Sequence, residues 1–167
     1  DIIEIMQSVR GMIFLLFTNG LLLDADTKKR LRKAPNVVPI VSIEGHREQT
    51  DERRGDGVYA RALSAVRSLQ ENNRLSGISF TVTSGNLKTV TGPDVLDSLY
   101  DEGCRIFIFV EYTPIADGTE HLVLSEEQRE ELESRLTQIR NEKRGLFISF
   151  PGDEKHWAVT TSTANPK

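Results

Sequence analysis

The sequence predicts an α/β fold built on a parallel sheet whose strands alternate with helices. Short runs of Val, Ile, Leu and Phe alternate with longer amphipathic stretches along the chain. The apolar runs are nearly continuous, as in parallel strands that helices cover on at least one face. No G-x-G-x-x-G or P-loop motif follows any of these runs, so the sequence signatures of nucleotide-binding sheets are absent. The pattern fits both an open, doubly wound sheet and a sheet rolled into a barrel.

The expected elements follow one another from the first residues to residue 150. Helices are predicted where apolar residues recur at helical spacing, and strands where β-branched and aromatic residues gather. Proline and glycine mark several of the turns between them. In chain order we predict helix 1–10, strand 12–20, helix 24–33, strand 37–45, helix 58–72, strand 77–86, helix 93–102, strand 105–112, helix 125–143 and strand 145–150.

Helix-capping residues support three of these boundaries. Asp24 or Asp26 can cap the helix over 24–33, because a short carboxylate accepts from the free N–H groups of the first turn. Pro93 suits the first position of its helix, where no N–H donor is needed. Ser125 is followed three residues later by Gln128, which is the spacing of a capping box. These helices therefore have defined starts.

The stretch 58–72 has the clearest helical pattern, whereas the strand over 37–45 has a feature against it. Pro39 lies inside that strand, and a proline removes one donor from the hydrogen-bond ladder. The helix, in contrast, carries a continuous apolar face made of Val58, Ala62, Ala65, Val66 and Leu69.

Length and charge point to one domain that does not bind nucleic acid. The chain has 167 residues and a formal net charge of −4, which fits a single domain. The basic run from Lys28 to Lys33 is local and suits the exposed C-terminal turn of a short helix. We therefore expect neither a nucleic-acid nor a membrane partner.

The chain has one cysteine, Cys104. One cysteine excludes an internal disulfide and any cysteine-based metal site made by this chain alone. Because Cys104 precedes an apolar strand, we expect a buried structural thiol. The apolar run over 12–17 is too short to span a bilayer, so a cytoplasmic location is expected.

Polar side chains follow the predicted strands at their carboxyl ends, where parallel α/β folds place functional groups. Alternation of side chains puts Ser42 with Glu44, and Thr81 with Thr83, on one face of their strands. The sequence thus predicts a polar mouth suited to hydroxyl, amine or carboxylate groups. The residues at these ends are Thr18, Asn19, Ser42, Glu44, Thr81, Thr83, Asn86, Glu111 and Tyr112.

Each of these residues also has a simpler interpretation. Thr18 to Gly20 can be a plain turn, and the threonines can serve strand propensity. The segment from Thr50 to Arg54 reads as a solvated loop with local ion pairs, or as a gate over the mouth. Glu111 is harder to explain structurally, because a carboxylate at the end of an apolar strand must be paired with another polar group or exposed to solvent.

Several segments together resemble the radical S-adenosylmethionine (radical SAM) enzymes. The SIEG tetrapeptide at Ser42, followed by TDERRG, is similar to the fourth strand and following helix of that family's partial (β/α)6 TIM-type barrel. TNG then corresponds to the end of the third strand, and TVT and VEY to the ends of the fifth and sixth. The resemblance runs over about 1–154 in the segments LLFTNGLLL, VSIEGHREQTDERRGDGVYARALSAV, GISFTVTSGNLKTVT, GCRIFIFVEYTPI and ISFPGDE.

This resemblance implies a cofactor, S-adenosylmethionine (SAM), lying across the strand ends. It places Ser42 and Glu44 near the ribose and amino-acid parts of the cofactor. Thr18 and Asn19 would line the same site, with Thr81 or Thr83 beneath. Glu111 would face cofactor or substrate and is the candidate catalytic residue. The substrate would be a small molecule or a peptide.

The family's CxxxCxxC loop, which holds a [4Fe–4S] cluster, and its Gly-Gly-Glu segment are absent from the sequence. The first ten residues resemble the helix after the second strand. We therefore expect a truncated, partial barrel over 1–154, a disordered tail over 155–167, and no catalysis by this polypeptide alone. The strand over 12–17 would have an exposed edge prone to self-association.

Two other functions fit the residues. One is a metal-free α/β lyase or hydrolase that uses Glu111 or Glu44 as a general base. The other is a non-catalytic binding or assembly module, derived from a barrel, that docks on another chain.

Overall fold

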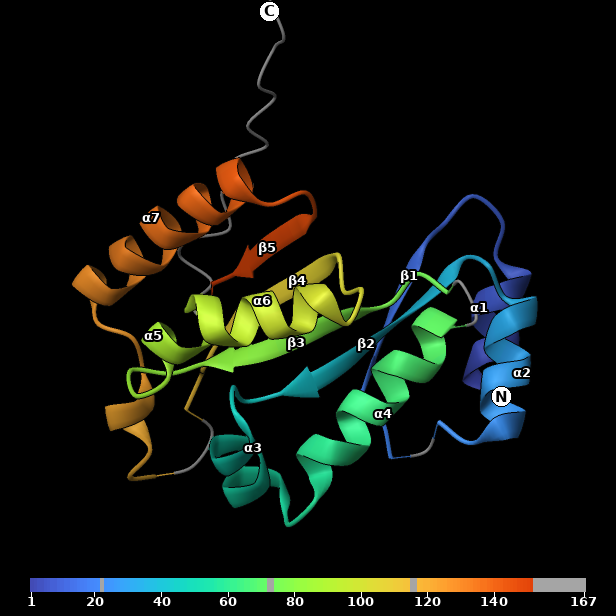
Figure 1. The fold of residues 1–167 in the computed structure, drawn as a ribbon, viewed down its shortest axis with the longest axis horizontal. Coiled ribbons are helices and arrows are strands. Elements are labelled where there is room, and N and C mark those ends of the chain that lie inside the picture. The colour runs from blue at the N-terminus through green and yellow to red at the C-terminus, as the bar shows by residue number, and fades with distance from the viewer. Residues whose placement is uncertain (22, 72–73, 115–116, 152–167) are drawn as a thin grey trace, which may run out of the picture.

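The computed structural model describes residues 1–21, 23–71, 74–114 and 117–151. The tail expected over 155–167 lies outside these ranges. Within them the chain forms one parallel sheet in the order β1-β2-β3-β4-β5, so each strand lies beside its neighbours in sequence (Figure 1). The predicted parallel α/β arrangement is confirmed. The strands are β1 (Phe14–Thr18), β2 (Val37–Ile43), β3 (Gly77–Val82), β4 (Ile106–Glu111) and β5 (Leu146–Phe150).

Helices precede and connect the strands, as the alternating pattern predicted. Asp24 caps α2 by accepting from the N–H of Thr27, and Ser125 with Gln128 forms the predicted capping box of α7. The helices are α1 (Ile2–Ser8), α2 (Ala25–Lys33), α3 (Arg47–Arg54), α4 (Val58–Glu71), α5 (Leu87–Val90), α6 (Pro93–Asp101) and α7 (Glu126–Glu142), with a 3₁₀ turn η1 (Glu120–Leu122).

Two expectations about these elements are wrong. The stretch 50–54, expected as a loop, belongs to helix α3. That helix has no aliphatic residue, so no apolar stripe revealed it. The strand expected over 77–86 ends at Val82, and the short helix α5 begins at Leu87.

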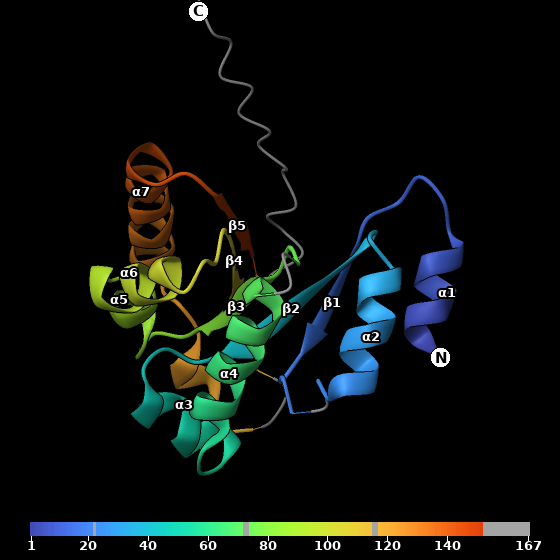
Figure 2. The same cartoon turned by 45° about the vertical axis from the view of Figure 1, so that its right-hand side comes forward.

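The helices cover one face of the sheet. Most buried apolar helix residues, such as Leu31, Val66 and Leu136, belong to one large core cluster. That cluster also contains strand residues at alternate positions, such as Val41 and Ile43 of β2 and Ile78, Phe80 and Val82 of β3. Helices α1, α2, α4, α6 and α7 accordingly lie along this side of the fanned strands (Figure 2).

The opposite face, called the inner face below, has a separate and smaller cluster. It consists of strand residues only among those described, and Val38, Ile40, Ile106 and Ile108 are its buried members. Side chains alternate along each strand, so Ser42, two residues beyond Ile40, also lies on the inner face. The inner face is therefore apolar near the amino ends of the strands and polar near the carboxyl ends of β2 and β3, whereas Val110 and Phe150 keep it apolar at the ends of β4 and β5.

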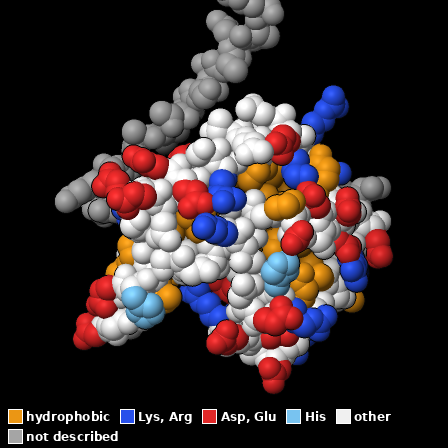
Figure 3. Space-filling model, turned by 60° about the vertical axis from the view of Figure 1, so that its left-hand side comes forward, with side chains coloured by type: hydrophobic (Ala, Val, Ile, Leu, Met, Phe, Trp, Pro, Cys, Tyr) orange, Lys and Arg blue, Asp and Glu red, His pale blue; other side chains and the backbone are white. Residues whose placement is uncertain are grey.

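The surface beside these elements carries charges of both signs. Lys and Arg side chains alternate with Asp and Glu over the face shown in Figure 3, with apolar patches between them. No helix in the described ranges is long and apolar enough to cross a membrane.

Strand β1 is an edge strand, as predicted for the segment 12–17. Phe17 of this strand is exposed, and so are two apolar residues just before it, Met12 and Ile13, of which Ile13 is 76% exposed. An edge strand offers unpaired N–H and C=O groups to another strand, and apolar side chains beside it favour such pairing.

We expect this edge to mediate self-association. Ile13→Lys should weaken it at least about tenfold, because burying an isoleucine contributes about 1.5–3 kcal/mol. Leu75→Lys, at an exposed apolar residue away from the edge, is the control and should change little. Light scattering across a concentration series measures the association. A wild-type chain that stays monomeric at high concentration would contradict the prediction.

Candidate functional site

The polar residues at the carboxyl ends of β2 and β3 meet on the inner face. Ser42 and Ser79 are register partners, and their Oγ atoms are 2.8 Å apart. Thr81 follows Ser79 by two residues and lies on the same face. Ser42 and Thr81 were predicted, whereas Ser79 was missed. The sequence pattern could have identified Ser79, since Ser79 and Thr81 alternate with apolar residues in GISFTV and so share one face of the strand.

Glu44 lies just past β2 and is held by two arginines of α3. The Arg53 Nη1 donates to Glu44 Oε2 at 2.8 Å, and the Arg54 Nε donates to Oε1 at 2.7 Å. The Glu44 side chain is only 3% exposed, so its charge is compensated by these contacts rather than by water. The backbone N–H of Glu44 also donates to Thr50 Oγ1. Polar contacts therefore fasten α3 to the end of β2.

Asn86 joins the ends of β2 and β3. Its Nδ2 donates to the carbonyl oxygens of Glu44 and Thr81, and its Oδ1 accepts from the N–H of Thr83 at 2.7 Å. Thr83 is buried in the turn beyond β3. The amide of Asn86 thus satisfies backbone groups that the ending strands leave without ladder partners.

Thr18 and Asn19 form a turn at the end of β1. Thr18 Oγ1 accepts from the N–H of Gly20, and Asn19 Oδ1 accepts from the N–H of Leu21. Thr18 is in register with Val41, a residue of the helix-covered face. The structure therefore separates Thr18 from the inner-face hydroxyls, although both lie at the carboxyl edge of the sheet.

Glu111, expected to face cofactor or substrate, points to the opposite side. It pairs in register with Val82 on the helix-covered face, and the Nε of Arg129 from α7 donates to its Oε2 at 2.9 Å. The alternation that places Ile108 on the inner face assigns Glu111 to the other one. The next residue, Tyr112, returns to the inner face.

Neither carboxylate has the arrangement of a free general base. Glu44 and Glu111 are buried, and each is hydrogen-bonded to arginine. A general base needs a lone pair within reach of the substrate proton, whereas both oxygens of Glu44 and the Oε2 of Glu111 already accept from guanidinium groups. Both carboxylates hold elements together in this structure.

The chain offers no fitting set of ligands for an iron–sulfur cluster. Cys104 is fully buried, and this burial raises the pKa of its thiol to about 12, with Glu102 adding to the shift. Thiolates are the ligands that such clusters require. Among the described residues no group of three His, Cys, Asp or Glu side chains is arranged to hold a metal ion.

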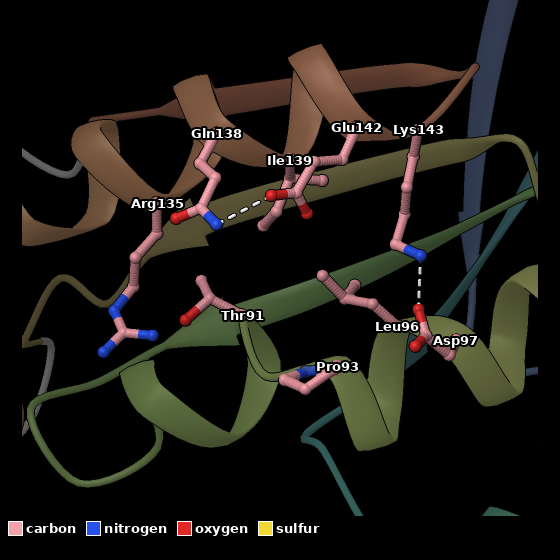
Figure 4. A pocket seen from close by; sticks show the side chains of 9 residues that line it. All are labelled: Thr91, Pro93, Leu96, Asp97, Arg135, Gln138, Ile139, Glu142 and Lys143. Carbon is pink, nitrogen blue, oxygen red and sulfur yellow. Dashed lines mark hydrogen bonds and ion pairs between the residues drawn. The ribbon is translucent and has the colours of Figure 1, made fainter.

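A cleft of about 210 Å³ opens between α6 and α7 on the helix layer (Figure 4). Its charged groups already have partners: Lys143 pairs with Asp97, Arg135 pairs with Glu131, and Glu142 accepts from Gln138. The cleft lies on the far side of the sheet from the inner-face hydroxyls. We therefore place the candidate site at the strand ends.

Comparison with known proteins agrees with this geometry. No family model matches the chain. Over 94 residues it is 32% identical to the Fe-coproporphyrin III synthase of Methanosarcina barkeri (strain Fusaro / DSM 804), which covers 56% of this chain and 23% of that enzyme. SuiB of Streptococcus suis has a similar structure, with a TM-score of 0.66 at 14% identity, covering 83% of this chain and 32% of SuiB.

A solved domain of the pyruvate-formate lyase-activating enzyme from Bacteroides vulgatus ATCC 8482 has nearly the same extent. It aligns with a TM-score of 0.56 at 14% identity over 90% of this chain and 89% of that domain. All three proteins are radical SAM enzymes. The chain has the fold of a radical SAM core domain.

The expected resemblance and the expected fold class are thereby confirmed. The chain spans about a quarter of the curated relative and a third of SuiB. SuiB has also been solved bound to S-adenosylmethionine and to its precursor peptide SuiA. In the radical SAM fold, the polar edge formed by Ser42, Ser79 and Thr81 is the carboxyl end of the parallel strands, where α/β folds bind ligands.

Replacing Glu44 tests the attachment of α3. Glu44→Gln leaves two guanidinium groups without their carboxylate, and we expect a loss of about 1–3 kcal/mol in the free energy of unfolding, since both arginines are partly solvated. Amide hydrogens of α3 should exchange faster. Glu131→Gln, in a surface pair with Arg135, should cost no more than about 0.5 kcal/mol. Equal losses in urea unfolding, or unchanged exchange in α3, would refute the assignment.

The thiol of Cys104 should be nearly inert in the folded chain. With a pKa of about 12, its thiolate fraction at pH 8 is about 1,000-fold below that of an ordinary thiol, and the thiolate is the reactive form. We expect labelling by a disulfide reagent to be slower by at least this factor than in Ser8→Cys, at an exposed position. Urea should abolish the difference. Fast labelling of the folded wild type would show the thiol to be accessible.

Proposed function

We propose that this chain supplies the S-adenosylmethionine-facing part of a radical SAM enzyme. The Ser42–Ser79 hydroxyl pair at the carboxyl ends of the strands carries the proposal. One hydroxyl of the pair donates to the other, and both keep further donor or acceptor capacity for a ligand. Thr81 adds a third hydroxyl to the same face.

The proposed roles of the other site residues follow from their contacts. Glu44, which is nearly inaccessible, positions α3 beside the mouth through Arg53 and Arg54. Thr83 is held in the turn that Asn86 organises. Thr18 and Asn19 border the mouth from the end of β1, where the exposed Asn19 side chain can reach a ligand.

The hydroxyl groups of Ser42, Ser79 and Thr81 suit a polar cofactor, whereas the single cysteine of the sequence cannot supply the ligands of an iron–sulfur cluster. S-adenosylmethionine carries ribose hydroxyls and an amino-acid group, which hydrogen-bond with serine and threonine. In radical SAM enzymes the bound cofactor supplies the radical that starts the reaction. This chain's residues would bind and orient it, and a [4Fe–4S] cluster would need ligands that this sequence does not contain.

A non-catalytic assembly module is the second candidate, and the edge of β1 favours it. This edge presents exposed apolar side chains beside unpaired backbone groups, and such edges dock onto strands of other chains. The general-base alternative loses support, because Glu44 and Glu111 are both bound by arginine.

Calorimetric titration with S-adenosylmethionine tests the proposal. We expect binding by wild type and an affinity about 5- to 10-fold lower for Ser42→Ala, the cost of about one hydrogen bond. Ser149→Ala is the control, because Ser149 pairs with Phe109 on the helix-covered face. After incubation with iron and sulfide, we expect no reductive cleavage of the cofactor.

Absence of wild-type binding, or equal effects of the two substitutions, would contradict the proposed cofactor site. Cofactor cleavage by the reconstituted chain would instead contradict the conclusion about the cluster. The two results are separate, since binding needs only the hydroxyl groups and cleavage needs an electron donor.

A further inference from the structure

Helix α3 stands at the mouth without any apolar packing of its own. Its eight residues, REQTDERR, are all polar, and none of them is a member of the core clusters. Burial of an apolar stripe is what normally holds a helix on the rest of a protein. The next helix along the chain, α4, has such a stripe. The position of α3 therefore depends on polar contacts.

These polar contacts, called the latch below, join α3 to the strand ends. Besides the two arginine pairs with Glu44, Thr50 Oγ1 accepts from the N–H of Glu44 at 3.1 Å. Gln49 Nε2 donates to Thr89 Oγ1 of α5 at 3.4 Å. When α3 detaches, water solvates the same groups, so desolvation offsets much of the attraction within the latch. Releasing α3 is therefore far less costly than releasing a helix with a buried apolar stripe.

Glycines with positive φ angles lie at both ends of α3. Gly45, with φ of 131°, precedes the helix, whereas Gly55 and Gly57, with φ of 103° and 74°, follow it. Glycine adopts such angles without a steric penalty and can exchange them for others. Hinges of moving segments are residues at the ends of elements that absorb changes in φ and ψ. The chain can therefore redirect α3 without disturbing β2 or α4.

The side chain of Arg53 extends from α3 across the mouth. Its Nη1 donates to Glu44, which follows β2, and its guanidinium carbon lies 5.8 Å from the ring centroid of Tyr112, which follows β4. Strand β3, which carries Ser79 and Thr81, lies between β2 and β4. Arg53 thus spans the carboxyl end of β3, and release of α3 removes this span.

We propose that α3 is a gate over the carboxyl edge of the sheet. In the structure the gate is closed, with the latch formed and Arg53 across the mouth. Opening breaks the latch, turns the chain at Gly45 and Gly55, and admits a ligand to the hydroxyl groups of Ser42 and Ser79. Control of ligand entry rests on the proposed cofactor function, whereas the opening of α3 itself does not.

The first arm of the test measures opening without a ligand. Salt screens ion pairs, whereas apolar packing is not electrostatic. A detached helix of this length is unstable in water, so its amide hydrogens exchange. Raising NaCl from about 0.05 M to about 1 M should speed exchange in α3 at least about threefold, and change it less than about 1.5-fold in α4. Equal responses of the two helices would overturn the proposal.

The second arm links the gate shut and measures ligand entry. Gln49→Cys and Thr89→Cys place two thiols at contacting positions on α3 and α5, and dibromobimane joins them. A closed gate slows entry and exit alike. Association and dissociation rate constants for S-adenosylmethionine should therefore both fall at least about tenfold, with Kd changed less than about threefold. Surface plasmon resonance measures both constants.

The same double variant with its two thiols capped separately is the matched control. It should bind at least as fast as the wild type, because it lacks one contact of the latch. Unchanged rates in the linked protein overturn the proposal. A loss of affinity at an unchanged association rate also overturns it, since the link then disturbs the bound state instead of access. A wild type that binds no S-adenosylmethionine contradicts the proposed cofactor function, while amide exchange still tests the opening of α3.

Discussion

The ion-paired carboxylate of Glu44 is the contact on which the mouth of this sheet depends. Helix α3 has no apolar side chain to bury, so the hydrophobic effect cannot hold it against the strands. Arg53, Arg54 and Thr50 attach it to Glu44, and Gln49 and Asp51 add polar contacts to Thr89 and Tyr59. Because a buried polar group without partners is costly, the same contacts that place α3 also satisfy and orient the Glu44 side chain.

The two faces of the sheet carry different kinds of side chains. On the helix-covered face, Glu111 and Arg129 tie β4 to α7, and apolar side chains fill the space between sheet and helices. On the inner face, the strand ends carry hydroxyl groups above an apolar floor. A ligand at the carboxyl edge therefore meets directional hydrogen-bonding groups, whereas the floor excludes water and strengthens those bonds.

The sequence predicted the strands, most helices and the polar strand ends, because these follow from local periodicity and capping. It failed for α3, because that helix has no apolar stripe, and its sequence signal is limited to end residues such as Arg53, Arg54 and Gly55, which are typical of a helix C-terminus. Glu111 was misplaced because the direction of a residue at a strand end depends on the strand's exact phase. The alternation of Ser79 with Thr81 could have been read locally, and the pairing of Ser79 with Ser42 required the register between strands.

On the inner face, apolar side chains change to polar ones toward the carboxyl edge of the sheet, where the candidate site lies. Along β2, Val38 and Ile40 give way to Ser42, and β4, on the other side of β3, passes from Ile106, Ile108 and Val110 to Tyr112 in the same direction. Packing of the core alone does not require this change from apolar to polar residues. Polar groups at the edge of a core must find hydrogen-bond partners, which apolar residues would not need. Parallel strands all end at the same edge, so one change of residue type at each strand end collects these groups into one mouth. Hydrogen-bonding groups thus gather at the carboxyl edge, where we propose ligand binding, and apolar packing dominates the rest of the sheet.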